Sequence, residues 1–424
     1  RYVPAGPSGA PTRGQANALP TGRNFYSVDP NTIPSPNAWA TGVALGDALL
    51  AKYLAEQGRY PETVGIVVWG TSAMRTHGDD VAEILYLLGV RPVWQRENRR
   101  VRGIEVVPLA ELGRPRIDVT ARISGFFRDA FPNLIHLMDD AVRMVAELDE
   151  PSDQNFVAAR VRSDAVRKEA AGMSREAAWR TSTYRVFGSK PGTYGAGILP
   201  LLDERNWQTD QDLAAVYQVW GAFAYGRGTF GAEAPDEFRE RFSSIVVAAK
   251  NQDNREHDIV DSDDYFQYHG GMVAMVRSLT GASPAAYVGD SAVPEAVRTR
   301  TLAEETHRVF RARVVNPRWV AAMQRHGYKG AFELAATVDY LFGYDATAGV
   351  VDDWMYEQLA QTYVFDETNR AFMERSNPWA LRGISERLLE AAERGLWAEP
   401  EAETLEGLRR VFLELEGELE GEEA

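Results

Sequence analysis

Apolar residues between positions 36 and 150 recur with two alternating periods. Over 38–58 the apolar spacing, which includes Leu45 and Leu49, is that of a helix. The run Thr63-Val64-Gly65-Ile66-Val67-Val68-Trp69 is apolar and rich in β-branched residues, which predicts a buried strand. The pattern then predicts helices over 79–88 and 130–148 and strands over 91–94, 103–107 and 117–123. Because helices and strands alternate, we expect an α/β domain over 36–150 with a short, mainly parallel sheet.

Beyond residue 150 the apolar pattern becomes mostly helical. The polar segment Asp149-Glu150-Pro151-Ser152-Asp153 is typical of a domain boundary followed by a helix N-cap. The predicted helices cover 154–171, 177–186, 210–225, 236–250, 263–279, 302–313, 330–341, 352–364, 380–396 and 403–419, and one strand-like island covers 285–288. We therefore expect a fold of α/β plus mostly α, in which a helical region with a few strands divides into 151–300 and 301–424.

Residues 1–35 differ from the rest of the chain because Gly, Pro, Asn and Ser are frequent in them. This composition is typical of irregular structure, and we expect an extended arm that lies across a larger body. The chain begins at Arg1, and its first residues already have the composition of a loop. We expect an upstream part of the same protein to precede it.

Composition narrows the range of possible functions. The 424 residues carry a net charge of −15, which disfavours nucleic acid because phosphate binding depends on clustered Lys and Arg. No apolar run reaches the roughly 20 residues of a membrane helix and no signal pattern opens the chain, so we expect a cytoplasmic protein without a membrane partner. The chain has no cysteine, so any metal must bind His, carboxylate or carbonyl groups.

Neither of two common nucleotide-binding motifs is supported by the sequence. Gly226-Arg227-Gly228-Thr229-Phe230-Gly231 fits G-x-G-x-x-G, but a dinucleotide site needs a strand before it and a helix directly after it. A helical stretch precedes this run, so we interpret it as a flexible loop. No G-x-x-x-x-G-K-[ST] motif occurs, and we do not expect this chain to hydrolyse ATP by that route.

Ligand-type side chains are densest between residues 251 and 269. The segment is Asn251-Gln252-Asp253-Asn254-Arg255-Glu256-His257-Asp258, followed by Asp261-Ser262-Asp263-Asp264-Tyr265 and His269. Part of this acidity has a structural interpretation, because a residue of 261–263 can cap the helix that follows. Glu, His and Asp also suit Co²⁺, Ni²⁺ or Zn²⁺, and the same carboxylates could accept protons. The spacing does not select among these metals.

Two loops elsewhere have the composition of ligand-binding segments. The loop 188–197 contains four glycines together with Lys190 and Tyr194, and its backbone N–H groups could meet carboxylates. The alternative is a plain connector. The segment 69–79 directly follows the predicted strand over 63–69, where α/β sheets place their ligand sites.

Short strings from the arm to the C-terminal helices carry a resemblance. They are Leu19-Pro20-Thr21-Gly22-Arg23-Asn24-Phe25-Tyr26, Trp69-Gly70-Thr71, Met74-Arg75-Thr76, Gly78-Asp79-Asp80, Gly113-Arg114-Pro115-Arg116-Ile117-Asp118-Val119, Ser124-Gly125-Phe126-Phe127-Arg128-Asp129, Val186-Phe187-Gly188 with Pro191-Gly192, Asn316-Pro317-Arg318-Trp319 and His326-Gly327-Tyr328-Lys329-Gly330-Ala331. Together they resemble the family that contains the large subunits of cobaltochelatase and of magnesium chelatase. The segments 252–258 and 69–76 look like the cobalt branch.

The resemblance implies the C-terminal part of a large tetrapyrrole-binding subunit. That subunit would insert Co²⁺ into hydrogenobyrinic acid a,c-diamide, a corrin precursor, in cobalamin biosynthesis. An AAA+ ATPase subunit and a subunit with an integrin-like domain would be its partners. These partners would use ATP and Mg²⁺, which this chain would not bind, and the metal chelatase would be active only as the assembly.

Metal insertion requires removal of the ion's water, distortion of the ring and acceptance of two pyrrole protons. We expect Glu256 and His257 to be metal ligands or proton acceptors. The acidic side chains of the ring need cationic donors, and its faces need aromatic contacts. Supporting carboxylates are Asp253, Asp258 and Asp261; candidate cations are Arg75, Arg185, Lys190 and Arg255; candidate aromatics are Trp69, Tyr194 and Tyr265.

Other interpretations stay open. The chain could be a non-catalytic scaffold that binds the ring or the ATPase subunits. It could belong to the magnesium branch, which inserts Mg²⁺ into protoporphyrin IX, or to a nickel-inserting relative. An unrelated acidic hydrolase with paired carboxylates is a further possibility. The proposed site requires that segment 251–265 and loop 188–197 face one cleft.

Overall fold

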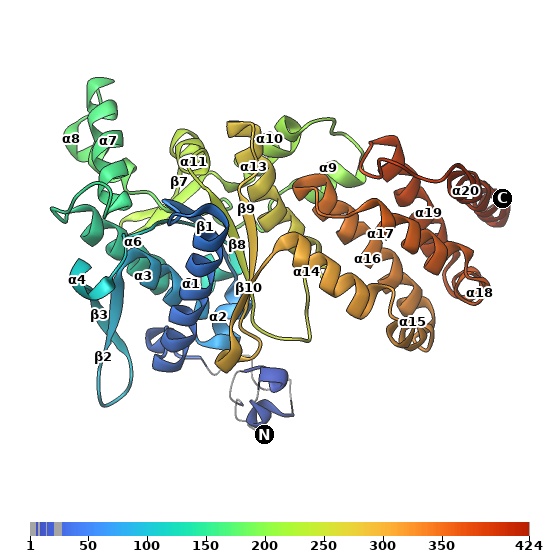
Figure 1. The fold of residues 1–424 in the computed structure, drawn as a ribbon, viewed down its shortest axis with the longest axis horizontal. Coiled ribbons are helices and arrows are strands. Elements are labelled where there is room, and N and C mark those ends of the chain that lie inside the picture. Colours follow the sequence, from blue (N-terminus) through green and yellow to red (C-terminus); the bar gives the residue numbers. More distant parts are fainter. Residues whose placement is uncertain (1–5, 7–8, 14, 21–27, 424) are drawn as a thin grey trace. The chain divides into compact units, whose positions relative to one another are not determined.

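The computed structural model describes residue 6 and residues 9–13, 15–20 and 28–423. The chain divides into two compact units (Figure 1). Unit 1 contains the residues up to Glu256 together with Gly271–Thr301, and unit 2 contains His257–Gly270 together with the residues from Leu302 onward. The chain therefore enters unit 2, returns to unit 1 and enters unit 2 again.

Unit 1 is built on an eight-stranded sheet in the order β10-β9-β8-β1-β4-β5-β6-β7. Its five central strands are parallel: β1 (Thr63–Val68), β4 (Asp118–Ile123), β5 (Val186–Gly188), β8 (Val247–Gln252) and β9 (Ala285–Asp290). The antiparallel strands β6 (Phe223–Gly226), β7 (Thr229–Glu233) and β10 (Arg298–Thr301) complete the two sides. A separate hairpin consists of β2 (Val90–Trp94) and β3 (Val101–Val106). The parallel centre brings five carboxyl strand ends to one edge, the carboxyl edge.

Helices cover both faces of this sheet (Figure 1). They are α1 (Pro36–Gln57), α2 (Gly70–Thr76), α3 (Asp79–Leu88), α4 (Leu109–Leu112), α5 (Gly125–Ala130), α6 (Pro132–Ala146), α7 (Phe156–Ala170), α8 (Arg175–Ser182), α9 (Ile198–Asp203), α10 (Asp210–Gly221), α11 (Pro235–Phe242) and α13 (Gly271–Thr280). Val64 and Ile66 of β1 share a core cluster with Leu49 of α1 and Leu85 of α3. Gly65, between them, faces Met272 of α13. Alternate residues of β1 thus meet helices on opposite faces.

The arm makes short turns and local contacts in the part that the structure describes. It contains the 3-10 turns η1 (Pro11–Arg13), η2 (Ala16–Ala18) and η3 (Pro30–Thr32), and a further turn of unit 1 is η5 (Pro294–Ala296). The Trp94 indole N–H donates to the carbonyl of Pro34 at 2.8 Å, and the Asn133 amide donates to that of Pro30 at 2.9 Å. Within the matched string 19–26, residues 21–26 lie outside the described residues.

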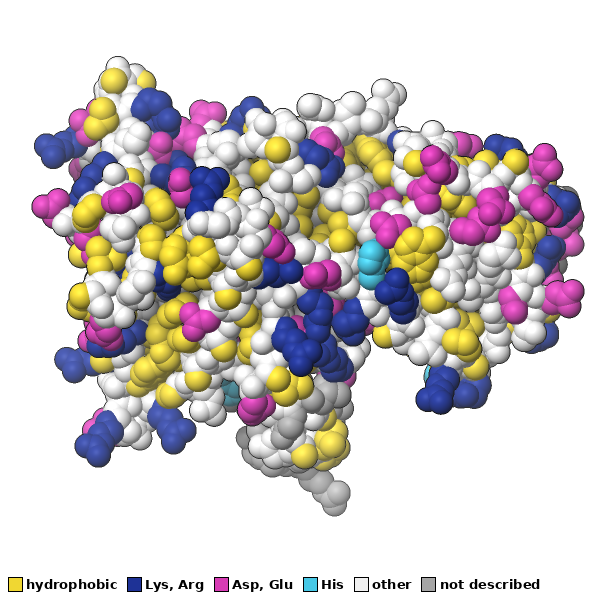
Figure 2. All heavy atoms as spheres, in the orientation of Figure 1, with side chains coloured by type: hydrophobic (Ala, Val, Ile, Leu, Met, Phe, Trp, Pro, Cys, Tyr) yellow, Lys and Arg dark blue, Asp and Glu magenta, His cyan; other side chains and the backbone are white. Residues whose placement is uncertain are grey.

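Unit 2 contains helices and no strand among its described residues. Its α-helices are α12 (Asp263–Tyr265), α14 (Leu302–Val309), α15 (Pro317–Gln324), α16 (Gly327–Ala348), α17 (Asp353–Leu359), α18 (Glu367–Ser376), α19 (Pro378–Glu393) and α20 (Ala402–Glu423); its π-helical segments are η4 (Phe266–Gly270), η6 (Phe310–Val314) and η7 (Ala360–Phe365). On the face that Figure 2 shows, acidic and basic side chains of this unit are interspersed. Arg382 joins α19 to α20 through Glu416 at 2.6 Å. No described helix has the length and apolarity needed to cross a bilayer.

The predicted fold class, α/β plus mostly α, is confirmed. Three predicted helices nevertheless extend too far. The helix predicted over 177–186 ends at Ser182, that over 210–225 ends at Gly221, and that over 236–250 ends at Phe242. The residues removed from these helices contribute to the strands β5, β6 and β8. Residues 149–153 lie within unit 1, whose sheet takes strands from both sides of this segment.

The strand β8 was missed because of its surroundings and composition. Its residues Val247–Gln252 are all buried, with β1 on one side and β9 on the other. Ala248, Ala249 and Lys250 have no strong strand propensity, so the local sequence favoured a helix. A strand buried on both faces has no alternation that could distinguish it from a buried helix.

The glycine-rich run 226–231 is also more ordered than predicted. It is the turn of the β6–β7 hairpin, in which Gly226 ends one strand and Thr229 begins the next. Gly228 has a φ of 74°, a conformation that glycine adopts without steric cost. The interpretation as a flexible loop is therefore corrected to a tight strand-to-strand turn.

Candidate functional site

The strand order of unit 1 reverses at β1. From β1 the chain continues to β4 and β5 on one side, and it later adds β8 and β9 on the other side. The reversal places the carboxyl ends of β1 and β8 beside each other, because the two strands are parallel neighbours. Ligands of open α/β sheets bind at such a switch point, outside the carboxyl ends of the strands. A ligand site is therefore expected first in the segments after β1 and β8.

An ion pair connects these two segments. Trp69 follows β1 and occupies the N-cap position of α2. From the last turn of α2, Arg75 donates to both carboxylate oxygens of Asp253 at 2.9 Å each, and Asp253 directly follows β8. Burial acts to raise the pKa of Asp253, but Arg75 and Arg13 outweigh it and the pKa is lowered. Asp253 is therefore a fixed negative charge and a weak proton acceptor at neutral pH.

Three buried acids begin the helix beside this ion pair. Asp79, Asp80 and Glu83, called here the α3 carboxylates, are each at most 2% exposed. Burial is the largest influence on all three and raises the pKa of Asp79 to about 7, of Asp80 to about 6 and of Glu83 to about 8. The switch point therefore has acids that titrate near neutrality next to one that stays ionised.

The arm contributes a cation to the same place. The guanidinium of Arg13 forms an ion pair with Asp79 and is itself 5% exposed. It also donates to the carbonyl of Asp253 at 3.3 Å and to the hydroxyl of Ser291, which follows β9, at 3.4 Å. Arg13 thus joins residues that follow β1, β8 and β9.

The loop predicted over 188–197 follows β5, which ends at the same edge. Arg128 of α5 is buried and organises this loop by donating to the carbonyls of Ser189, Lys190 and Thr193 at 2.8–3.2 Å. Tyr194 is 61% exposed, and its hydroxyl donates to Asp129 at 2.7 Å. Lys190 is exposed. The loop therefore presents an ammonium group and an aromatic ring to solvent on a fixed backbone.

The segment after Asp253 crosses between the units. Arg255, Glu256 and His257 are exposed, and unit 1 ends at Glu256 while unit 2 begins at His257. Arg255 donates to Asp290 at 2.7 Å, and Asp290 also pairs with Arg300 at 2.9 Å. Among the described residues, no group of three or more His, Cys, Asp or Glu side chains is arranged to hold a metal ion.

The remaining candidates of this segment belong to unit 2. Arg313 of η6 donates to both carboxylate oxygens of Asp258 at 2.7 Å and lies 3.1 Å from Asp261. The backbone N–H of Asp258 donates to the Asp261 carboxylate at 2.8 Å. This bond closes a turn that holds both carboxylates next to the Arg313 guanidinium. Tyr265 ends the short helix α12, whose N-cap is Ser262. Segment 251–265 is thus divided between the units, and the expectation that it faces one cleft with loop 188–197 stays a prediction.

Arg185 lies away from the carboxyl edge. It precedes β5 and donates to both oxygens of Asp118, the first residue of β4, at 2.6 and 3.0 Å. Arg185 also donates to the carbonyls of Ser182 and Tyr184 at 2.9 Å and is only 2% exposed. This guanidinium is committed to the amino edge of the sheet. The expectation that Arg185 binds the ring stays a prediction, and these contacts of its guanidinium all lie at the amino edge.

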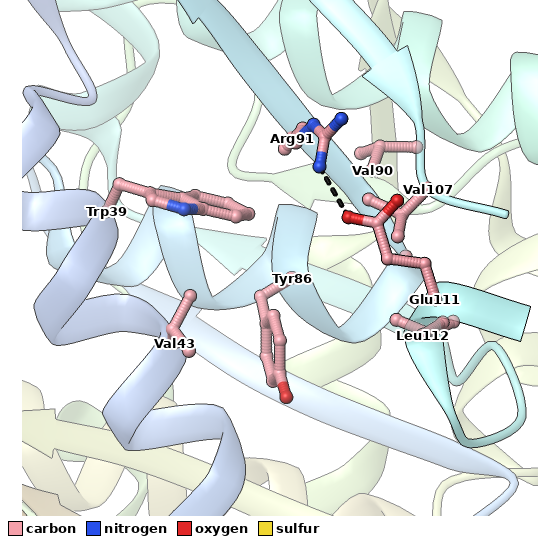
Figure 3. A pocket seen from close by; sticks show the side chains of 9 residues that line it. Trp39, Val43, Tyr86, Val90, Arg91, Val107, Glu111 and Leu112 are labelled. Atoms are coloured by element: carbon pink, nitrogen blue, oxygen red, sulfur yellow. Dashed lines mark hydrogen bonds and ion pairs between the residues drawn. The ribbon is translucent and has the colours of Figure 1, made fainter. Parts of the chain in front are cut away.

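A pocket of about 270 Å³ lies elsewhere in unit 1 (Figure 3). Trp39 of α1 and Tyr86 of α3 line it, with ring centroids 6.3 Å apart. On the other side Arg91 of β2 pairs with Glu111 at 2.6 Å. None of the predicted site residues lines this pocket.

Several residues of the switch point were not predicted as site residues. Asp79 lay in the candidate segment 69–79 and, like Asp80, in a matched string, but neither was assigned a role. Glu83, Asn251 and Arg13 had no assigned role either. A signal for the acids existed, because positions 79, 80 and 83 fall on one face of the predicted helix. Nothing in the local sequence indicated that Arg13 would reach them, since 66 residues separate Arg13 from Asp79.

The fold and the charged switch point define a class: α/β proteins with a polar ligand site at the carboxyl edge of a parallel sheet. The model of the CobN/Magnesium Chelatase family matches residues 1–404. This chain belongs to that family, and the resemblance seen in the sequence is confirmed.

Individual relatives come from both branches of the family. An aerobic cobaltochelatase subunit CobN of Pseudomonas aeruginosa is 53% identical over 99% of this chain and 33% of that protein. The chloroplastic magnesium-chelatase subunit ChlH of Oryza sativa subsp. indica is 35% identical over 99% of this chain and 30% of that protein. A solved structure, the catalytic subunit of cobaltochelatase from Mycobacterium tuberculosis, matches with a TM-score of 0.95 at 66% identity over 98% of this chain and 35% of that chain. The chain spans about a third of the length of these relatives.

Proposed function

We propose that this chain is the C-terminal part of the large tetrapyrrole-binding subunit of an ATP-dependent cobaltochelatase. The reaction would insert Co²⁺ into hydrogenobyrinic acid a,c-diamide in cobalamin biosynthesis. The observation that carries the choice of metal is the difference in similarity: 53% identity to a cobalt-branch relative against 35% to a magnesium-branch relative, each over 99% of the chain. The charged switch point supplies a place for the reaction.

The exposed pair Glu256 and His257 is the proposed metal-handling element. Both side chains are accessible to a substrate, whereas Asp253 is buried in its ion pair with Arg75. A carboxylate and an imidazole suit Co²⁺. Two protein ligands would hold the ion loosely enough for the ring nitrogens to replace them, as an enzyme that delivers a metal requires. Asp253, Asp258 and Asp261 then act as supporting charges, two of which are positioned by Arg313.

The ring would be held by the exposed groups of the carboxyl edge. Lys190 and Arg255 are exposed cations for the carboxylates of the ring, and the exposed Tyr194 and the partly buried Trp69 are the candidates to contact its faces. Arg75 contributes through Asp253, which it keeps in place. Tyr265, in unit 2, is also proposed as an aromatic contact of the ring.

The energy source would lie outside this chain. We propose that an AAA+ ATPase subunit and a subunit with an integrin-like domain bind ATP and Mg²⁺ and drive insertion, together with the upstream part of the same large subunit. The absence of a G-x-x-x-x-G-K-[ST] motif in the sequence supports this division of labour. The assembly would be cytoplasmic.

The test uses the full-length subunit assembled with its partners. Glu256→Ala and His257→Ala, singly and together, are expected to lower Co²⁺ insertion at least 100-fold while the ring still binds, because only the metal step is affected. Glu367→Ala and His326→Ala, which change exposed residues of the same types in unit 2, are matched controls and are expected to keep the rate. Unchanged insertion by the double variant would remove the assigned roles.

The magnesium branch is the second candidate, because relatives at 35% identity carry that name. Insertion of Mg²⁺ into protoporphyrin IX and of Co²⁺ into the corrin precursor should be measured with the same wild-type assembly. We expect only the cobalt reaction. A preference for Mg²⁺ and protoporphyrin would overturn the cobalt assignment, and ring binding without insertion of either metal would favour a scaffold.

A further inference from the structure

The α3 carboxylates are arranged on one face of a helix that starts at the switch point. Asp79 and Asp80 are the first two residues of α3, and Glu83 lies one turn further along. Residues three and four apart on a helix are neighbours, so Glu83 faces both aspartates. Because all three are buried, their charges are poorly screened and cannot all be present at low cost.

Asn251 of β8 links two of these acids. Its amide nitrogen donates to Asp80 at 2.9 Å and to Glu83 at 2.6 Å. An amide nitrogen has two protons, so each carboxyl group receives one of them. Asp80 and Glu83 therefore share one hydrogen-bond donor, the Asn251 amide, in the interior beside β8.

Asp79 leaves one oxygen open. Its Oδ2 pairs with Arg13 and accepts from the hydroxyl of Ser291 at 3.3 Å. Its Oδ1 is buried and has no hydrogen-bond partner among the described residues. A buried acceptor without a donor is costly, and an incoming proton or proton donor would satisfy it. This open oxygen lies on the acid that also shares Arg13 and Ser291 with the site around Asp253.

The α3 carboxylates have fewer cations than acids around them. Arg13 acts on Asp79, and Lys250 acts on Asp80. Within the described part of the chain, the charges that act on Glu83 are those of Asp79 and Asp80, which raise its pKa further after burial. The nearby cation Arg75 is already engaged by Asp253. The group can therefore take up and release protons near neutral pH.

Insertion of a divalent metal into a corrin ring releases the inner N–H proton. The ring N–H bond breaks, its electron pair stays on the nitrogen and forms a bond to the metal, and the proton needs an acceptor. We propose that the α3 carboxylates, of which Asn251 links Asp80 and Glu83, accept the released proton from the site beside Asp253 and hold it in the interior of unit 1. This proposal rests on the proposed chelatase function and adds a proton path to it.

The other acids near the site are less suited to this task. Asp253 is held ionised by two hydrogen bonds from Arg75. Asp258, in unit 2, accepts two hydrogen bonds from Arg313. A carboxylate that is stabilised in its charged form gives up that stabilisation when it is protonated. The α3 carboxylates gain from protonation instead, because it removes buried charge.

The test measures single-turnover Co²⁺ insertion by the full-length subunit with its partners between about pH 6 and 8.5. The wild-type rate is expected to rise with pH through about 7, because Asp79 must lose its proton before it can accept another. Asp79→Asn and Glu83→Gln keep the shape of the side chain and are expected to slow insertion at least tenfold, and Asp79→Asn should also remove this rise. Binding of the ring should stay within twofold.

Two further variants separate a proton path from a packing role. Arg13→Ala removes a cation that lowers the pKa of Asp79, so the rise should move to higher pH and persist. Asp345→Asn changes a buried acid of unit 2 whose pKa is raised, mainly by burial, to about 6, and it should leave the profile in place. If Asp79→Asn or Glu83→Gln does not fold, two measurements still test the proton path. They are the insertion rate of Asp80→Asn and the pH shift of Arg13→Ala.

The outcomes distinguish this proposal from the function on which it rests. If the wild-type assembly inserts Co²⁺ and the amide variants keep both its rate and its pH profile, the proton path is wrong and the chelatase function stands. If the wild-type assembly inserts no Co²⁺ into the ring, the proposed function itself fails. A uniform loss of rate in the amide variants with an unchanged pH profile would also overturn the path, because that result indicates a positioning role.

Discussion

The sheet of unit 1 carries a buried charged cluster at each edge, and the two clusters differ in how their charges are balanced. At the amino edge, Asp118 accepts two hydrogen bonds from Arg185, and Arg160 and Arg241 lie 3.8 and 3.9 Å from it. Arg241 also pairs with Asp164. Asp118 therefore lies among three arginines, and Asp164 is in direct contact with one.

At the carboxyl edge the balance is reversed. The α3 carboxylates and Asp253 make four buried acids, and the cations that act on them are Arg13, Arg75 and Lys250. No cation of the described residues is among the groups that shift the pKa of Glu83, which is about 8. The paired charges of the amino edge hold strands in place. The excess of buried acids at the carboxyl edge lowers the free energy of unfolding. Such uncompensated acids are typical of functional sites.

The largest effect is expected at the amino edge. Arg185→Ala leaves Asp118 buried without its two-bond partner, and the loss of one partner of a buried pair costs about 3–5 kcal/mol. Thermal or denaturant unfolding of the chain measures it. Replacing both residues, as Asp118→Val with Arg185→Met, removes the orphaned charge and should recover most of the loss. A destabilisation below about 1 kcal/mol for Arg185→Ala would contradict the structural role of this edge.

At the carboxyl edge, function should suffer more than stability. Asp253→Asn removes the charge that Arg75 holds, and we expect Co²⁺ insertion by the assembly to fall about 100-fold, equivalent to roughly 3 kcal/mol of activation free energy. The unfolding midpoint should change less than in Arg185→Ala, because the Arg75 side chain is 26% exposed and water can solvate it. Asp29→Asn, which alters an exposed ion pair with Arg100, is the control. A loss of stability as large as that of Arg185→Ala, with activity per folded molecule intact, would erase the contrast between the edges.

The pH dependence of stability gives the third test. The folded-state pKa of Glu83, about 8, lies above its ordinary value of 4.5. Between these values the folded state keeps a proton that the unfolded state has lost, so stability is full below about 4.5 and falls as pH rises toward 8. The slope reaches about 1.4 kcal/mol per pH unit for one such group. Unfolding midpoints at pH 5, 6.5 and 8 should decline less steeply in Glu83→Gln than in the wild type, and parallel declines would show that Glu83 does not titrate in this range.

The sequence predicted local elements well where one face is apolar and the ends carry clear signals. The helix over 79–88 matches α3 residue for residue, since an amphipathic pattern ends at Gly89 in a left-handed C-cap. The strand β8 was missed because burial on both faces removes the alternation that marks a strand. Prediction therefore failed at the strand that, with β1, forms the switch point.

The sequence named two residues of the switch point but did not predict that they pair. Arg75 and Asp253 were both named, but their contact spans 178 residues and depends on β1 and β8 being neighbours. Arg185 was named from its charge, whereas its position before β5 places it at the other edge. A residue type and a spacing indicate possible chemistry, and only the strand order decides which side chains meet.

The smallest effect is expected where an ion pair is exposed to water. Arg91 pairs with Glu105 and Glu111, yet its side chain is 42% exposed and theirs are 49% and 54% exposed. Because water and salt screen such charges, Arg91→Ala should change the free energy of unfolding by less than about 1 kcal/mol, and less still at high salt. Comparison with Arg185→Ala under the same conditions sharpens the contrast, since both variants remove an arginine with carboxylate partners. A loss comparable to that of the buried pair would mean that the Arg91 side chain is needed for packing around Trp39 and Tyr86, the pocket that it lines.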